Sequence, residues 1–495
     1  MNPGSPQIEA SSGFAERVRA AVVWRWGSQI VSQLITWTAT ILVVRLLDPR
    51  DYGLFAMTQA VVTAFNFLNG YGFATALIQA RDVSERRVGQ AFGMLLIAAL
   101  ALAAAQFIAA PYAAAYFGQP LITPMLRVQA LIFLATPFIS IPSVMLARQL
   151  DFRRQALNNL VCALAGASTG LGMAWAGYGA WALVWAPIVM FTTRAIGLTI
   201  ASGRLVKPVF DFRGCGELIG FGTAFTLSQL FWIVQSQADV VIAGRSFDPH
   251  QLGLYSEALF LTLIFTGRFL PPLNEVAFPA YAELRNAGKP LGPAFLSGAR
   301  MIMLVAMPFY VGLSLVAGPL VLTFFGAKWA DMVPIVAGLS LAMPAMTLHF
   351  VCSPATNGLG RPGIYLATSI AGAVLMPACF FVGVQAGPMG LVSAWQAAAP
   401  LLLTITLALT LPALGVRVQD LAAALLPPAL ACAFMAAAVK GLAQLASGFP
   451  PASQLVLLAG AGGLAYLGTL WAFWPQMLRE NLARIRKPSQ PAPAH

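Results

Sequence analysis

Long apolar runs separated by short polar breaks make up almost the whole chain. A helix needs about 20 apolar residues to cross the hydrocarbon core of a bilayer, and runs of this length recur from end to end. The pattern predicts an all-α polytopic membrane protein with about 14 transmembrane helices. The expected spans lie near residues 22–46, 52–80, 88–110, 121–147, 155–177, 180–203, 217–244, 252–282, 294–318, 333–357, 362–384, 388–412, 420–443 and 453–475.

The composition supports this reading and excludes several other classes. Only 9% of the residues are charged, whereas soluble domains carry about 25%. The net charge of +12 does not indicate nucleic-acid binding, because the basic residues are spread over many loops rather than gathered on one face. The five cysteines are scattered without a CxxC pair, so we expect no metal site, and no cofactor is expected either.

The distribution of basic residues predicts the orientation. With the N-terminus in the cytoplasm, 21 of the 29 Lys and Arg residues fall on cytoplasmic segments or their flanks, and six fall outside. Cytoplasmic loops of membrane proteins are enriched in Lys and Arg, so both termini are expected in the cytoplasm. The predicted organisation is an N-terminal segment, an N-lobe of six helices, a linker, a C-lobe of six helices, two further helices and a tail, at 1–20, 21–203, 204–216, 217–412, 413–475 and 476–495.

An internal repeat relates the two lobes. The fragment RLLDPRDYGLF begins at Arg45 and RSFDPHQLGLY begins at Arg245, 200 positions later without a gap. Because six spans separate them, the halves share one orientation, related by an axis along the membrane normal. In each fragment Asp-Pro is expected to end a helix and the glycine to permit a tight restart; a ligand role for the arginines stays open beside this hinge role. The hinge residues are Arg45, Asp48, Pro49, Gly53, Arg245, Asp248, Pro249 and Gly253.

Polar residues recur at helical spacing inside otherwise apolar spans. A carrier of a polar, anionic head needs such stripes, because hydrocarbon rejects both charge and hydroxyl groups. The alternative for uncharged residues is that they hold helices together, and Arg194 could instead extend to the membrane surface. The candidate cavity residues are Arg25, Gln29, Gln33, Thr36, Gln59, Asn66, Asn69, Arg194, Gln229, Arg268 and Asn274.

Three further residues are candidates for coupling transport to ions. Asp239, Glu275 and His349 could each carry a proton, and Asp239 could bind sodium. Two alternatives remain open: Asp239 pairs with Arg245 or caps a helix end, and His349 is a packing residue with a satisfied ring. The last two spans carry almost no polar residue, so no site is expected there.

Several segments together resemble a known family. They read RLLDPRDYGLFAM, GFATALIQARDVSE, YFGQPLITPMLRVQAL, ARQLDFRRQAL, IAGRSFDPHQLGLYSEA and FFGAKWADMVPIVAGL, within residues 15–440. The chain resembles the polysaccharide transporters of the multidrug/oligosaccharidyl-lipid/polysaccharide superfamily, most nearly the Wzx-type flippases for lipid-linked oligosaccharides. The resemblance implies two six-helix lobes around a central cavity, two further helices, and alternating access.

The same resemblance implies a function. Such proteins flip polyprenyl-pyrophosphate-linked oligosaccharide repeat units across the bacterial inner membrane, for exopolysaccharide, capsule or O-antigen assembly. The expected partners are this substrate, membrane lipids and a polysaccharide polymerase or export complex, and a working monomer is expected. The main alternative is a cation-coupled multidrug exporter of the same superfamily. A polymerase or glycosyltransferase is disfavoured, because the chain has three His, no DxD pair and no long loop.

Overall fold

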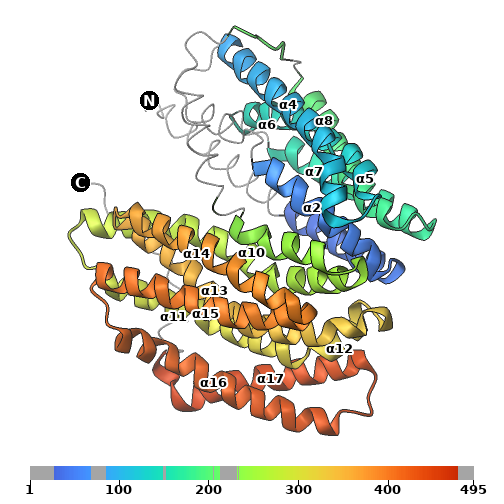
Figure 1. Cartoon of the computed structure of the whole chain (residues 1–495). Helices are drawn as coiled ribbons and strands as arrows, with labels where there is room; N and C mark the ends of the chain where they lie inside the picture. Colours follow the sequence, from blue (N-terminus) through green and yellow to red (C-terminus); the bar gives the residue numbers. More distant parts are fainter. Residues whose placement is uncertain are drawn as a thin grey trace, which may run out of the picture. The chain divides into compact units, whose positions relative to one another are not determined.

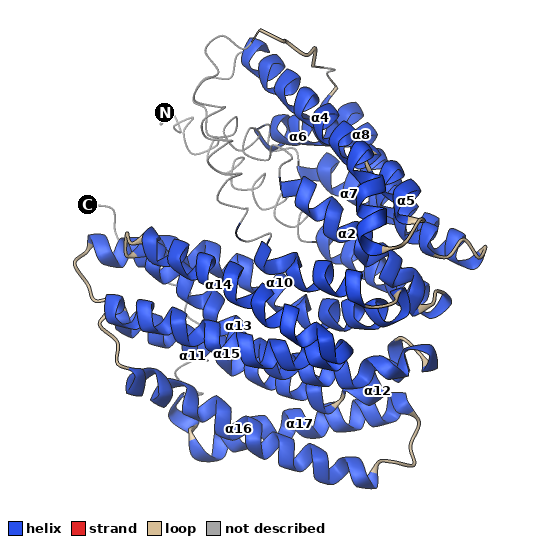
Figure 2. Cartoon of the chain, viewed as in Figure 1, coloured by secondary structure: helices blue, strands red, loops and turns tan. Residues whose placement is uncertain are grey.

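The computed structural model describes residues 27–67, 85–148, 152–203, 206–211, 231 and 234–477. Within these ranges the regular secondary structure is entirely helical (Figure 2). Nine segments of the described residues are long and apolar enough to cross a membrane. The prediction of an all-α multi-pass membrane protein is therefore confirmed, while the count of fourteen spans stays a prediction.

The chain divides into two compact units. The first contains residues 1–233 and 247–253, and the second contains residues 234–246 and 254–495. The described helices of the first unit follow the predicted spans closely. They are a helix over Gly27–Leu46, α2 (Pro49–Phe67), α4 (Glu85–Phe117), α5 (Ile122–Gln129), α6 (Leu131–Arg148), α7 (Phe152–Trp175) and α8 (Ala180–Ser202) (Figure 1).

The second unit repeats this order and extends it. Residues 234–246 are helical and correspond to the helix over 27–46. Two further helices, α16 and α17, follow the repeat. The elements are α10 (Pro249–Asn286), α11 (Gly292–Leu315), α12 (Ala317–Phe324), η1 (Ala327–Met332), α13 (Val333–Gly358), α14 (Pro362–Gly383), η2 (Val384–Ala386), α15 (Gly387–Leu414), α16 (Val418–Leu445) and α17 (Pro451–Phe473).

The core of the first unit joins helices that are far apart in sequence. α7 and α6 both pack on α8, and α4 packs on α6. A cluster of buried side chains connects α2, α5, α6 and α8. Its apolar members remove water from the faces of these helices, which leaves their other faces for lipid. The buried members are Leu54, Met125, Ile132, Ala180, Val184 and Ile188.

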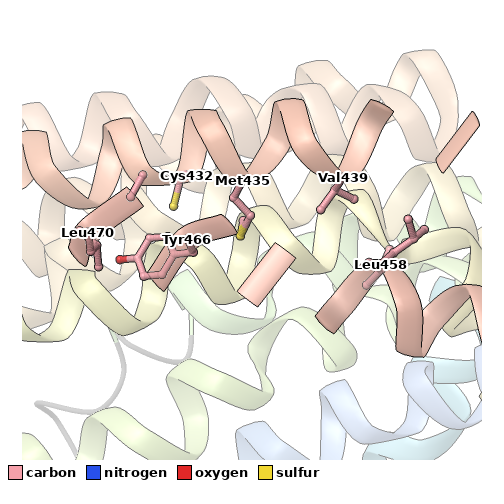
Figure 3. Packing of buried hydrophobic residues seen from close by; sticks show 8 residues of the cluster. Cys432, Met435, Val439, Leu458, Tyr466 and Leu470 are labelled. Carbon is pink, nitrogen blue, oxygen red and sulfur yellow. The ribbon is translucent and has the colours of Figure 1, made fainter. Parts of the chain in front are cut away.

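In the second unit the last two helices pack on the repeat. α16 lies against α11, and α17 lies against α12 and α16. Figure 3 shows the cluster between them, in which Met435 and Cys432 of α16 meet Tyr466 and Leu470 of α17. The Tyr466 hydroxyl also donates a hydrogen bond to the carbonyl of Leu304 in α11, at 2.8 Å. The sequence placed no site in this pair, and its buried residues are almost all apolar.

The repeated fragments fold in the same way. One helix ends just before residues 47–48, and α2 begins at Pro49; another ends before residues 247–248, and α10 begins at Pro249. Burial alternates identically over residues 43–50 and 243–250. Proline suits the first helical position because its missing N–H would have no intrahelical partner there.

The two glycines of these fragments differ from the sequence expectation. Neither forms the turn: Gly53 lies inside α2 and Gly253 inside α10. A Cβ added to Gly53 would overlap the carbonyl oxygen of Pro249, and one added to Gly253 would overlap that of Pro49. The glycines are therefore required for close approach, because each helix start packs on the other within the first unit.

Candidate functional site

Three predicted cavity residues, Arg25, Asn69 and Gln229, lie outside the described residues. The others are distributed over both units.

The helix over 27–46 carries the first polar stripe. Gln29 and Thr36 are exposed and Gln33 is half-buried. The Thr36 hydroxyl donates to the carbonyl of Ser32, at 2.8 Å, so its hydrogen bond stays within its own helix. The two glutamine amides make no hydrogen bond to any residue that the structure describes. An amide side chain carries two donors and one acceptor oxygen, which the described residues leave unused at both positions.

The second stripe lies on α2. Gln59 and Asn66 are both half-buried, seven residues and about two helical turns apart. Neither amide forms a hydrogen bond within the described ranges. The alternative that these amides hold helices together has no hydrogen bond to support it among those residues.

Arg194 has a different environment. It is half-buried in α8, and the side-chain amide of Asn158 in α7 donates to its backbone carbonyl at 3.2 Å. The Nε of Arg194 is buried, with no hydrogen-bond partner among the described residues. Packing between α7 and α8 therefore fixes this residue, and no hydrogen bond between described residues joins it to the stripes on the helix over 27–46 or on α2.

The charged face of α10 is the main polar feature of the second unit. Glu257, Arg268 and Glu275 are eleven and seven residues apart, close to three and two full turns, so they share one face. Arg268 lies at the midpoint of this 38-residue helix. Its side chain is exposed and has no hydrogen bond or ion pair to any described residue. Asn274, half-buried, is one position before Glu275.

The sequence predicts a membrane span over residues 252–282, and Arg268 lies near its centre. α10 is not among the nine segments of the described residues that are apolar enough to count as spans, so its crossing of the membrane stays a prediction. A guanidinium deep in a membrane costs at least about 2.5 kcal/mol unless water, a counter-charge or an anionic ligand meets it. If α10 crosses the bilayer, Arg268 is a side chain that could bind an anion there.

A buried polar network lies elsewhere in the same unit. Asp239, only 1% exposed, accepts a hydrogen bond from the Tyr255 hydroxyl at 2.8 Å and one from the backbone N–H of Val240 at 2.8 Å. The Tyr255 hydroxyl in turn accepts one from Nε1 of Trp395, at 2.8 Å. The network joins residues 234–246, α10 and α15. Asp239 thus has hydrogen-bond partners of its own, and those found here do not include Arg245.

The other two coupling candidates are separate from this network. Nδ1 of His349 in α13 is 2.8 Å from Oγ1 of Thr406 in α15, and the histidine is 9% exposed. Glu275 is exposed on α10. No hydrogen bond among the described residues joins Asp239, Glu275 and His349 to one another.

The repeated fragments cap their helices in two ways. In the second, the Asp248 carboxylate accepts from the N–H groups of His250 and Gln251 at 2.8 and 2.9 Å. In the first, Asp51 contributes: its carboxylate accepts from the N–H of Asp48 at 3.2 Å and from that of Ala180, the first residue of α8, at 3.0 Å. Side-chain caps of this kind satisfy N–H groups that a helix start leaves unpaired.

Sequence reasoning missed three of these residues. Tyr255 and Trp395 were not among the candidates, although the repeat held a signal for the first: Tyr255 corresponds to Phe55, so a hydroxyl was gained at a matched position. The role of Asp51 was also missed, because its partner Ala180 is 129 positions away. Arg45 and Arg245 are both exposed, which leaves a ligand role for them open.

Comparison with known proteins places the chain in a family. Residues 42–334 match the family described as "Polysaccharide biosynthesis protein", and the chain belongs to it. It is 24% identical to the succinoglycan biosynthesis transport protein ExoT of Rhizobium meliloti, over 97% of this chain and 98% of that protein. It is also 24% identical to the teichuronic acid biosynthesis protein TuaB of Bacillus subtilis, over 84% and 87% of the two chains.

Solved structures share the fold. The inward closed conformation of the lipid II flippase MurJ superposes with a TM-score of 0.72 at 12% identity, covering 92% of this chain and all of that one. An inward-facing multidrug resistance MATE family transporter of the MOP superfamily gives 0.60 at 15% identity, over 77% and 93%. These structures confirm the expected transporter fold, and with the family they confirm the resemblance seen in the sequence.

Proposed function

We propose that this protein is a flippase that translocates a polyprenyl-pyrophosphate-linked oligosaccharide repeat unit across the bacterial inner membrane by alternating access. The product supplies exopolysaccharide, capsule or O-antigen assembly. The names of the relatives support this function, since ExoT is a succinoglycan biosynthesis transport protein and TuaB a teichuronic acid biosynthesis protein. The observation that carries the proposal at the level of chemistry is Arg268 at the midpoint of α10.

Arg268 is proposed to bind the pyrophosphate, together with Arg25. A guanidinium presents a planar fork of donors that matches phosphate oxygens, and such charge-assisted bonds are stronger than neutral ones. An anionic ligand would also offset the cost of holding this cation at membrane depth. The charge on Arg268 thus serves transport directly, whereas an apolar residue would be the cheaper choice for stability.

The amide stripes are proposed to bind the sugar. Sugars carry many hydroxyl groups, and each hydroxyl needs a partner once it leaves water. Gln29, Gln33, Gln59 and Asn66 supply carbonyl and amino groups that no described residue occupies. Such groups are tolerant of different sugars, because an amide can donate and accept at the same site.

Orientation and assembly complete the proposal. The excess of basic residues on one side supports cytoplasmic termini. Two lobes in one chain support a working monomer, which would deliver its cargo to a polysaccharide polymerase or export complex. Among the coupling candidates, Asp239 and His349 already have hydrogen-bond partners, so the exposed Glu275 is proposed as the most accessible.

A transport assay tests the role of Arg268. The full-length protein in proteoliposomes would be given a fluorescent polyprenyl-pyrophosphate oligosaccharide, and its appearance in the opposite leaflet measured. We expect Arg268→Ala to lower the rate at least tenfold and Arg268→Lys to retain part of it, because the charge persists without the fork. The matched control is Arg285→Ala, at the last turn of the same helix, which should transport within twofold of wild type. Wild-type transport by Arg268→Ala would refute the anion-binding role.

A second candidate function is favoured by one observation. Glu257 and Glu275 flank Arg268 on the same face of α10, and carboxylates suit organic cations rather than phosphates. A cation-coupled multidrug exporter is therefore the alternative. Efflux of organic cations from vesicles, abolished by Glu257→Gln or Glu275→Gln while lipid-linked oligosaccharide is not moved, would establish it in place of the flippase.

A further inference from the structure

An apolar groove opens between the helix over 27–46 and α7, within the first unit. It is a wide-open groove with a volume of about 560 Å³. Apart from one arginine, the lining is apolar. The lining residues are Leu42, Arg45, Leu46, Leu171, Gly172 and Trp175.

The absence of a side chain at Gly172 keeps this groove open. A Cβ added to Gly172 would have no heavy atom within 4 Å, whereas one added to Gly170, two positions earlier, would contact Ala186 and Val43. Gly170 therefore faces neighbouring helices, and Gly172 faces the groove. Space beside a glycine on a transmembrane helix is then available to a ligand instead of to a side chain.

The matched position in the second unit carries a large side chain. Gly179 and Gly387 both have positive φ, at 55° and 74°, and stand at the start of α8 and α15. They are 208 positions apart, as are Gly118 and Gly326, which also have positive φ. The same offset matches Gly172 with Phe380 of α14. Phe380 is fully buried, and its ring lies 5.2 Å from the ring of Trp395 in α15.

Aromatic residues indicate the depth of the groove. Trp175 at its edge is 84% exposed and Tyr178, just beyond α7, is 59% exposed. Exposed Trp and Tyr residues gather at the level of lipid headgroups. Arg45 lies at the same end of its helix, one position before its last residue Leu46. The groove therefore extends from the interface toward the hydrocarbon, with a positive charge near the headgroups.

We propose that this groove binds one acyl chain of an anionic phospholipid, with its phosphate held at Arg45. The leucines and Trp175 would contact the chain through van der Waals packing, which drives association inside a bilayer. Arg45 already has an interaction within the protein, and a guanidinium has five N–H donors, so it would pair with the phosphodiester through further donors. The site is separate from the residues proposed to bind the transported substrate, and it does not depend on the flippase function.

Photo-crosslinking in lipid nanodiscs tests the proposal. The full-length protein would be reconstituted with phosphatidylglycerol that carries a diazirine on one acyl chain, and labelled peptides identified by mass spectrometry. We expect labels on residues 42–46 and 171–175. Gly172→Phe, which introduces the ring that the second unit has, should reduce this labelling at least tenfold. Gly172→Ala, the matched control, should leave it within twofold of wild type.

A second comparison isolates the headgroup. A diazirine phosphatidylcholine should label the groove about fivefold less, as expected for loss of one favourable charge contact. Arg45→Gln should remove the difference between the two lipids while leaving the apolar walls intact. This result does not require Gly172→Phe to fold, although we expect that variant to keep the wild-type thermal midpoint.

Three outcomes would overturn the proposal. They are labelling elsewhere but not in the groove, equal labelling by both lipids in the wild type, and displacement of the probe by polyprenyl phosphate but not by unlabelled phosphatidylglycerol. The last result would assign the groove to a prenyl chain. None of them bears on transport by Arg268 variants, so failure here is distinguishable from failure of the flippase function.

Discussion

The two units share a frame but differ in what they bury beside it. Residues 43–50 and 243–250 have the same pattern of burial and the same helix break. A few residues away the interiors diverge. In the first unit Phe55 packs against the apolar cluster of α2, α5, α6 and α8. In the second, the matching Tyr255 binds Asp239 and Trp395 through its hydroxyl.

This difference shows that the two repeats keep the same helix break but differ in the buried residues beside it. The matched position of Asp239 is Ala39, buried and apolar. A complete polar network is tolerated in a dry interior because each member satisfies the next, while a partial one is costly. Asp239 and Tyr255 therefore form an interdependent pair, and Trp395 joins them to a third helix. In the first unit the matched residues are the buried Ala39 and Phe55, which packs on the apolar cluster.

Transplanting the carboxylate into the first unit gives the largest expected effect. Ala39→Asp would bury a charge where the residue that matches Tyr255 is Phe55, which has no hydroxyl. We expect the free energy of unfolding, measured by denaturant titration in detergent micelles, to fall by about 4 kcal/mol. Adding Phe55→Tyr should recover about 2 kcal/mol, the value of a hydrogen bond to a charged group. If Ala39→Asp alone lowered the free energy of unfolding by less than about 1 kcal/mol, the position of Ala39 would not be an apolar interior without water.

The glycines of the repeat test the shared frame. Gly53→Ala and Gly253→Ala each push a methyl group into a backbone carbonyl, that of Pro249 or Pro49. Backbone atoms cannot rotate away, so each should cost about 3 kcal/mol, at the upper end of overpacking. The same unfolding titration measures both.

The control for these variants is Gly267→Ala. It lies in α10 with no atom within 4 Å of the added methyl group, so it should be neutral or stabilising. The two repeat glycines should also cost the same, because each contacts the turn of the other. A large cost at one and none at the other would show that the approach is not mutual.

The sequence was sufficient for the class of fold, for a physical reason. A membrane span appears in the sequence as a run of apolar residues, and a repeat appears as matching residues at a fixed offset. Both can be recognised without knowing which distant residues are in contact. Asp239 was also visible, because a carboxylate in an apolar run is rare. Its partner Trp395 was not, since Trp395 and Tyr255 are 140 positions apart and tryptophan is ordinary in a membrane helix.

The same limit explains the two glycine results. From sequence, Gly53 was a turn residue, which is the commonest reason for a glycine after Asp-Pro. Its real requirement is the neighbouring carbonyl of Pro249, which only the packed structure brings near. Likewise, Gly172 and Phe380 look unrelated until the positive-φ glycines fix the offset between the halves. Whether a glycine is needed depends on which residues of other helices lie beside it, and these neighbours cannot be read from the sequence directly.

Removing the hydroxyl of Tyr255 gives the smallest expected loss of stability. Tyr255→Phe makes the second unit match the first at this position. It leaves the Asp239 carboxylate with one donor fewer and Nε1 of Trp395 without an acceptor, so we expect a loss of about 2 kcal/mol in the unfolding titration. Tyr310→Phe is the matched control: Tyr310 is also fully buried, but among the described residues its hydroxyl makes no hydrogen bond of normal geometry, and Thr266 and Thr347 are its nearest polar neighbours. Its removal should cost less than about 1 kcal/mol, because only these weak contacts are lost. Equal losses for the two variants would mean that hydroxyl burial, and not the network, distinguishes the second unit.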